Sequence, residues 1–133
     1  MRVQMRLSRE SEIILKNEKK SYKMKEDITV TYGWLVNQIT KFIFSQDINK
    51  IDWKFVRGYK LKLVDESQAD DCEYNTTLNL ENTVLEEIHT MQIAFKDIFG
   101  ASRVHKAFVV RMVLKSNYLL NQNIHIFKEE TRC

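Results

Sequence analysis

The sequence predicts a mostly α-helical protein with one small antiparallel β-ribbon. The 133-residue chain contains no proline and only three glycines, too few turn residues for a fold built from many β-hairpins. Two short segments alternate polar and apolar residues with the two-residue period of a strand, and each precedes segments whose apolar residues recur at helical spacing. The length predicts one domain, or two very small units that share a core. Hydrophobic residues make up 44% of the chain and charged residues 29%, which favours a globular protein over a disordered chain.

The first alternating segment is "RVQMRLS" at residues 2–8. A strand places alternate side chains on opposite faces. Here this separates an apolar set from a polar set: Val3, Met5 and Leu7 against Arg2, Gln4 and Arg6. Ser8 is expected to cap the helix that follows. A second helix is expected in "TVTYGWLVNQITKFIF", with either Thr29 or Thr31 as its cap.

The second half of the chain shows the same order of elements. "NTTLNL" at residues 75–80 alternates in the same way, with a polar side formed by Asn75, Thr77 and Asn79. A helix is expected to follow and to end at Gly100, and Ser102 is expected to cap another helix. A shift of 73 residues lays one half on the other without a gap and aligns Leu7 with Leu80 and Thr29 with Ser102. We interpret the strand–helix–turn–helix order as a tandem repeat.

The predicted organisation is a first repeat (1–46), a connector (47–73), a second repeat (74–120) and a C-terminal tail (121–133). The apolar part of the connector is expected to pack on the body with one short helix, because a long connection without structure of its own is unusual. Its "YKLKLV" segment is expected to be an extra strand or an extended link, and its acidic part an exposed loop. The tail is expected to be frayed by its end.

The net charge of +3 is distributed unevenly, with a balance of +7 over residues 1–64 and −4 over residues 65–133. A basic half can attract phosphate, and it can equally be an ordinary solvated helix face. Cys72 and Cys133 are expected to be reduced thiols of a cytoplasmic protein. No segment approaches the apolar length of a membrane span, so no membrane association is expected.

A short strand followed by two helices resembles the ribbon-helix-helix (Arc/MetJ-like) family of DNA-binding proteins. In that family two copies pair their strands into an antiparallel ribbon that enters the major groove. The resemblance implies a tandem ribbon-helix-helix fold in which one chain forms an intrachain pseudo-dimer. Pairing of residues 2–7 with the same strand of a second chain, and hence self-association, is the alternative; we favour the intrachain pairing because the repeat supplies a matched partner.

The resemblance also implies which residues contact double-stranded DNA. The base-contacting residues would be the polar faces of the two strands: Arg2, Gln4, Arg6, Asn75, Thr77 and Asn79. The phosphate-contacting residues would lie at the start of each second helix and on the lysine-rich segment 16–25: Thr29, Thr31, Ser102, Arg103, Lys19 and Lys20. Tandem copies in one chain are similar to accessory proteins of plasmid DNA transfer (conjugation), which implies a relaxase or another protein of a DNA-transfer complex as a partner. Transcription regulation on a mobile element is the other role implied.

Two further readings of the sequence compete with DNA binding. A helical protein-interaction module, such as an assembly subunit or an inhibitor, would share the helices but would not need outward arginine and glutamine on a strand. An enzyme is not expected, because no strand-to-helix elbow or glycine loop accompanies the serine, histidine and acidic residues. No metal or other cofactor is expected, since the three histidines have no ligand spacing with each other or with the cysteines: His89, His105 and His125.

Overall fold

The computed structural model describes residues 1–62 and 74–129. The acidic loop expected within the connector and the last residues of the tail lie outside this described part. The elements in chain order are β1 (Arg2–Leu7), α1 (Arg9–Glu26), α2 (Tyr32–Ser45), α3 (Trp53–Gly58), β2 (Tyr74–Asn79), α4 (Asn82–Phe99) and α5 (Lys106–Asn121). The fold is therefore mostly α-helical with one two-stranded antiparallel sheet, and the predicted fold class is confirmed at this level.

The sheet forms within one chain, because β1 pairs with β2. The antiparallel register places Arg2 opposite Asn79 and Gln4 opposite Thr77. Each strand buries alternate side chains, as the polar and apolar alternation of the sequence predicts. Leu7 and Leu78 are 0% and 1% exposed on the inner face of the sheet. Of the two strand pairings that the sequence left open, the structure has the intrachain one.

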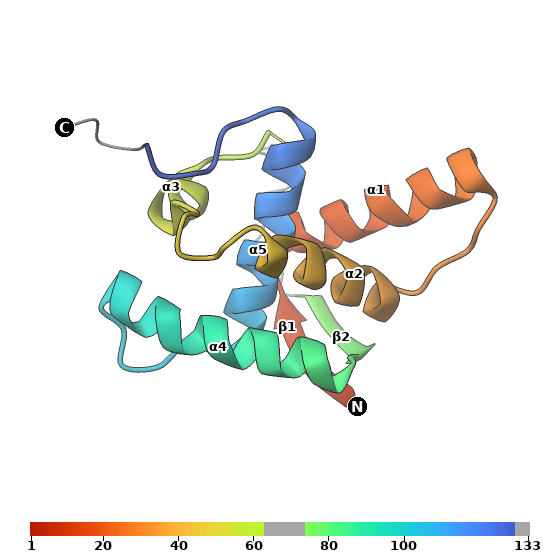
Figure 1. Cartoon of the computed structure of the whole chain (residues 1–133). Helices are drawn as coiled ribbons and strands as arrows, with labels where there is room; N and C mark the ends of the chain where they lie inside the picture. Colours follow the sequence, from red (N-terminus) through yellow and green to blue (C-terminus); the bar gives the residue numbers. More distant parts are fainter. Residues whose placement is uncertain (63–73, 130–133) are drawn as a thin grey trace.

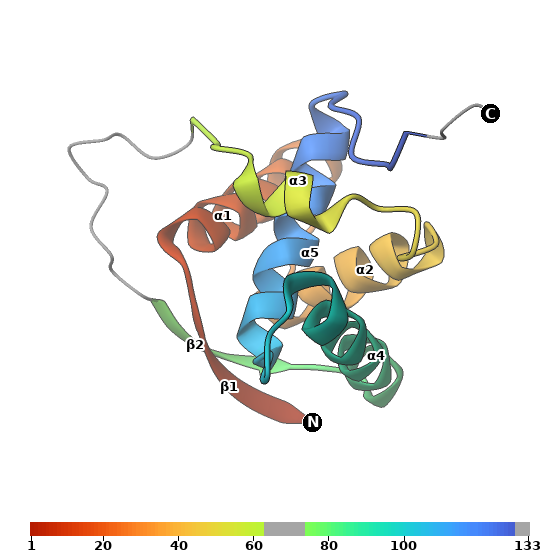
Figure 2. The same cartoon turned by 90° about the vertical axis from the view of Figure 1, so that its left-hand side faces the viewer.

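Helix α5 lies at the centre of the molecule, and the other elements are arranged around it (Figures 1 and 2). It contacts α1, α2, α3, α4 and β1. The sheet lies beside the N-terminal end of α5, whereas the C-terminal end of this helix points to the opposite side of the molecule (Figure 2). The middle of α5 is fully buried at Val109, Val113 and Leu114, so this helix forms the core on which both halves of the chain pack.

The first helix of each half has matching bounds under the shift of 73 residues. The shift moves α1 onto α4 residue for residue, from Arg9–Glu26 to Asn82–Phe99. It also aligns the two helix ends, since Asp27 and Gly100 both adopt the left-handed conformation, with φ of 54° and 63°. Glycine takes that conformation without steric cost, and Asp is one of the few other residues that tolerate it. The predicted helix end at Gly100 and the predicted cap at Ser8, whose side chain accepts from the Ser11 amide, are both confirmed.

The second helix of each half differs at its start. Thr31 caps α2, because its hydroxyl accepts a hydrogen bond from the Trp34 amide at 3.1 Å. The predicted cap at Ser102 is wrong: α5 begins at Lys106, and its N-cap residue is His105. The intervening Val104 is only 8% exposed, and its carbonyl accepts a 2.8 Å hydrogen bond from the Gln92 side chain. Because Val104 is buried and its carbonyl accepts this hydrogen bond, the helix does not begin before Lys106.

The connector packs on the body, as predicted. Trp53 at the start of α3 is 1% exposed, its ring centroid lies 4.8 Å from that of Phe95, and its indole N–H donates to the Ile48 carbonyl at 2.9 Å. The described residues of "YKLKLV" (59–62) form a link that ends in a turn, and not a strand. The described tail is also ordered against the connector, since Phe127 forms a β-bridge with Ile51.

Candidate nucleic-acid interface

The outer face of the β1–β2 sheet brings together all six residues predicted to contact bases. Each of these side chains is exposed: Arg2, Gln4, Arg6, Asn75, Thr77 and Asn79. They come from two strands far apart in the sequence, and the antiparallel register pairs them directly across the sheet. We call this surface the ribbon face. Residues opposite one another on a sheet lie about 4.5–5.5 Å apart, so the six side chains form one continuous polar surface.

The ribbon face is rich in hydrogen-bond donors of the types that recognise base edges. A guanidinium can donate two parallel hydrogen bonds to guanine, and the amides of glutamine and asparagine can pair with adenine. Both arginines belong to β1, whereas β2 contributes Asn75, Thr77 and Asn79. The two edges of the ribbon face therefore differ in charge and in donor geometry.

The N-terminus of α2 lies directly against one end of β2. A Cβ atom added at Gly33 would come within 2.9 Å of the Asn79 backbone nitrogen, so only glycine fits this contact without a backbone shift. Asn37, one turn further along α2, donates to the Asn79 carbonyl at 3.2 Å and accepts from the Glu81 amide at 3.1 Å. These contacts fix the ribbon relative to the start of α2. The only sequence signal for Asn37 was a polar residue on an apolar helix face.

Side chains predicted to contact phosphate are placed unequally around the start of α2. The Lys19 ammonium lies 5.1 Å from the centroid of the Tyr32 ring, so this lysine reaches the first turn of α2 from α1. Thr31 caps the same turn. Thr29 is exposed two residues before this cap, and Lys20 is exposed on α1.

The N-terminus of α5 borders the ribbon face from the side of β1. A groove of about 800 Å³ is lined there by strand residues, including Gln4, Arg6 and Asn75, and by residues of the α5 segment, of which three carry side-chain nitrogens: His105, Lys106 and Arg111. Sequence reasoning missed these three because it placed the helix start at Ser102. Ser102 and Arg103 are exposed but do not line this groove. The run "VHK" could have indicated a phosphate-binding position, because His105 and Lys106 carry side-chain nitrogens beside a helix start.

An ion pair joins the start of α1 to α5 behind the sheet. The Lys115 ammonium lies 3.9 Å from the Glu10 carboxylate and donates to the Arg57 carbonyl at 3.2 Å. Burial raises the pKa of Glu10 and lowers the pKa of Lys115, while the attraction between the two charges opposes both shifts. The pair connects α1, α3 and α5 and takes no part in the ribbon face.

Within residues 1–62 and 74–129, no group of three or more histidine, cysteine or acidic side chains is placed to hold a metal ion. In the same part of the chain, no helix combines the length and the hydrophobicity needed to cross a bilayer. The chain matches no protein-family model, no curated protein and no solved structure.

Proposed function

We propose that this protein is a tandem ribbon-helix-helix protein that binds duplex DNA with sequence preference through the β1–β2 ribbon. The observation that carries the proposal is the ribbon face itself, a single exposed surface of paired base-recognising side chains. A two-stranded ribbon fits the major groove of B-DNA, where each base pair presents a distinct pattern of donors and acceptors. Arg2, Gln4 and Arg6 would contact bases from β1, with Asn75, Thr77 and Asn79 contacting the adjacent bases from β2.

The strand register supports the proposed repeat and pseudo-dimer. In a symmetric ribbon the central residue of one strand lies opposite its own equivalent on the other strand. Under the shift of 73 residues Gln4 corresponds to Thr77, and these two residues are paired in the sheet. Arg2 is likewise paired with Asn79, the equivalent of Arg6. The register therefore agrees with a local two-fold axis through the Gln4–Thr77 pair.

The two helix starts support a role for phosphate binding at both sides of the ribbon. Free amides and the positive end of the helix dipole favour an anion at a helix N-terminus. In this proposal the first turn of α2, with Thr31 and Lys19, would hold one DNA backbone. The first turn of α5, with His105 and Lys106 at the edge of the ribbon face, would hold the other.

The biological role that we propose is that of an accessory factor in plasmid DNA transfer or a transcriptional regulator of a mobile element. It rests on the resemblance of tandem copies in one chain to such proteins. A relaxase or another protein of a DNA-transfer complex would be a partner in the first of these roles, and the cytoplasm would be the compartment in both.

Selection of bound sequences from a pool of random duplexes tests the proposal. We expect one enriched motif without two-fold symmetry, because β1 and β2 present different side chains to the two halves of the site. One chain should occupy one motif, as measured from the mass of the complex on a short duplex. Absence of any enriched motif would refute sequence-preferring DNA binding, and a palindrome occupied by two chains would refute the binding of one chain to one asymmetric motif.

Replacing Lys19 and Lys20 together by glutamine is expected to weaken binding to the selected duplex and to random duplexes by the same factor. Each lost phosphate contact should lower the slope of log affinity against log salt by about one, because fewer counterions are released on binding. Fluorescence anisotropy over a salt series measures this slope. The double variant Lys50→Gln/Lys54→Gln loses the same charge near α3 and should keep the parent slope. A loss confined to the selected duplex would show that Lys19 or Lys20 contacts bases instead.

A further inference from the structure

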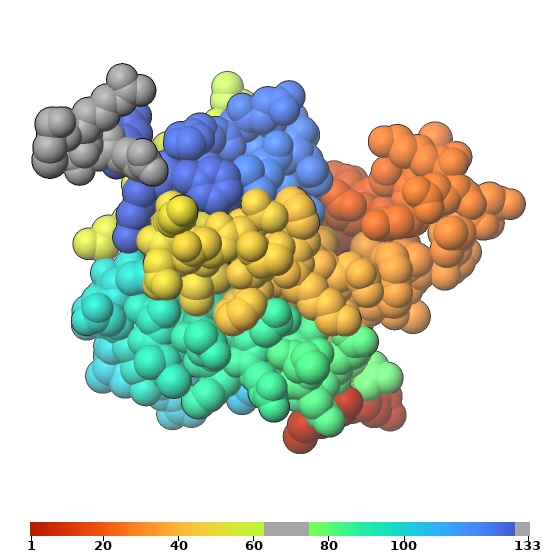
Figure 3. Space-filling model, in the orientation of Figure 1, coloured from red at the N-terminus to blue at the C-terminus, as the bar shows by residue number. Residues whose placement is uncertain are grey.

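A groove of about 290 Å³ lies between α1, α2 and the C-terminal end of α5. Five of its lining residues matter for the argument: Glu18, Tyr22, Leu35, Phe42 and Asn121. Phe42 is 47% exposed at this groove. The nearby Trp34 is 39% exposed, and its ring centroid lies 5.4 Å from that of Tyr22 in a T-shaped contact. Large aromatic side chains are thus left open to solvent between three helices. Its α5 residues belong to the C-terminal end of that helix, which points away from the sheet (Figure 2), and α1, α2 and this end of α5 lie together on the face shown in Figure 3.

The equivalent surface in the second half of the chain is covered. The shift of 73 residues that aligns α1 with α4 takes Tyr22 to Phe95, and it takes Phe42 to Lys115. Helix α3 occupies this place: the Trp53 ring packs on Phe95 at 4.8 Å, and Lys115 donates to the Arg57 carbonyl. Phe95 is 0% exposed and Lys115 8% exposed as a result. Helix α3 thus covers one of the two equivalent surfaces, and the groove beside α1 is the other.

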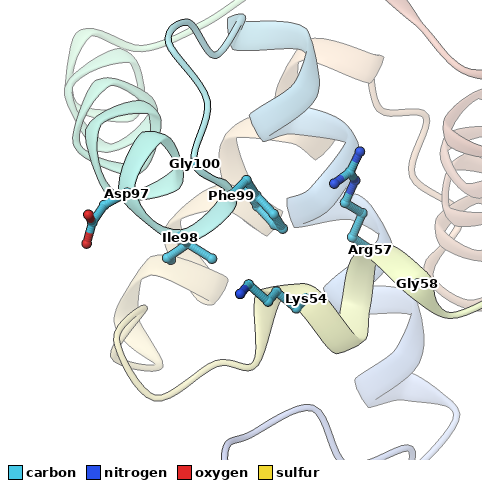
Figure 4. A pocket seen from close by; sticks show the side chains of 7 residues that line it. All are labelled: Lys54, Arg57, Gly58, Asp97, Ile98, Phe99 and Gly100. Carbon is cyan, nitrogen blue, oxygen red and sulfur yellow. The ribbon is translucent and has the colours of Figure 1, made fainter.

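The residue that accepts the hydrogen bond of the α3 anchor also has an equivalent at the open groove. The Trp53 indole N–H donates to the Ile48 carbonyl, which follows the C-terminal end of α2. The same shift relates Ile48 to Asn121, the last residue of α5 and a lining residue of the groove. Figure 4 shows how α3 meets the end of α4 on the covered side, with Lys54 and Arg57 extending from α3 beside Phe99. The Arg57 guanidinium lies 5.3 Å from the centroid of that ring.

The open groove differs from the covered surface in its charge. Glu18 stands where the second half has Met91. Burial raises the pKa of Glu18 and the nearby Lys25 opposes the shift, so an additional cation beside this carboxylate would be stabilising. The groove is therefore complementary to an aromatic side chain accompanied by a basic one.

We propose that this groove binds a short amphipathic helix of a partner protein, which inserts an aromatic anchor beside Tyr22 and places a lysine or arginine against Glu18. The helix would cover the first half of the chain as α3 covers the second. This inference rests on the proposed internal repeat and goes beyond DNA binding. The groove and the ribbon face lie at opposite ends of α5, so the partner helix would not cover the side chains proposed to contact bases.

The test uses the full-length ¹⁵N-labelled chain and a synthetic peptide of residues 48–60, which contains the α3 sequence and is itself basic. We expect saturable amide shift changes that cluster at Glu18, Tyr22, Phe42 and Asn121. Phe42→Asp should weaken peptide binding at least tenfold, and Glu18→Gln should weaken it several-fold. The matched control Ile93→Asp, which alters a 56% exposed apolar residue of α4, should bind the peptide as the parent does.

Three results would overturn the proposal: no localised shift changes at millimolar peptide, equal binding by Phe42→Asp, or a second copy of the chain as the occupant. In the last case the parent alone would dimerise with rising concentration and Phe42→Asp would stay monomeric. A thermal melt of each variant confirms that it is folded. DNA binding is measured on the same samples. A parent chain that binds DNA but not the peptide would refute this inference alone, and a parent chain that binds the peptide but not DNA would refute only the proposed DNA function.

Discussion

The double variant Arg2→Ala/Arg6→Ala is expected to lose about 2–6 kcal/mol of binding free energy on its selected duplex, because each bidentate arginine–guanine contact contributes about 1–3 kcal/mol. Both side chains are exposed on the ribbon face, so their removal should leave the fold unchanged. Random duplexes should lose less affinity, because only the sequence-independent attraction of two charges disappears. Anisotropy titrations with the selected and a random duplex measure both quantities, and the ratio of the two affinities should fall.

The double variant Lys50→Ala/Lys54→Ala removes the same charge from exposed positions near α3 and is the matched control. It should keep the parent ratio between selected and random duplexes. If it loses affinity as strongly as the arginine variant does, the effect of the arginines is one of net charge and the ribbon face does not recognise bases. Gln4→Ala should relax the preference at a single base pair, which a repeated selection would show.

Trp53→Ala is expected to destabilise the protein by about 3–5 kcal/mol, the usual cost of replacing a fully buried aromatic side chain by alanine. The Trp53 side chain is 1% exposed, and its removal opens a cavity beside Phe95 and deprives the Ile48 carbonyl of its donor. Unfolding by urea at equilibrium, followed by circular dichroism, measures the loss as a lower midpoint. The measurement also tests whether the connector is part of the folded core.

The chain supplies its own control for this experiment in its other tryptophan. Trp34 is 39% exposed on α2, so Trp34→Ala should cost less than about 1 kcal/mol. Trp53→Phe should recover most of the packing energy but not the hydrogen bond. Equal destabilisation by Trp34→Ala and Trp53→Ala would contradict the distinction between a buried connector and an open groove beside α2.

The ribbon could be predicted from the sequence because the direction of a strand side chain is a local property. Alternation alone separated Arg2, Gln4 and Arg6 from the buried residues between them. The start of α1 and the end of α4 could also be predicted because they depend on neighbouring residues. Ser8 accepts a hydrogen bond from an amide three residues away, and Gly100 adopts the left-handed conformation that glycine allows. Features of this kind require no knowledge of the tertiary fold.

The start of α5 and the groove beside it could not be predicted in this way. The helix begins late because Val104 is buried and bound by the side chain of Gln92, twelve residues earlier in the chain. This displacement brings His105 and Lys106 to the ribbon face in place of Ser102. Asn37 was missed for the same reason, because its partners are backbone groups of Asn79 and Glu81. Residues whose role depends on such distant contacts carry no periodic signal.

The intrachain ribbon has a consequence for the way this protein folds. Its paired residues are 67 to 77 positions apart in the chain, so their contacts raise the contact order of an otherwise helical protein. The chain entropy lost on closing so long a loop must be offset by packing that forms together with the ribbon. During synthesis β1 leaves the ribosome long before β2 exists, and α5, on which the sheet packs, follows later still. The surface proposed to bind DNA is therefore absent from a nascent chain until β2 has been made, and its packing is completed only when the last helix is available.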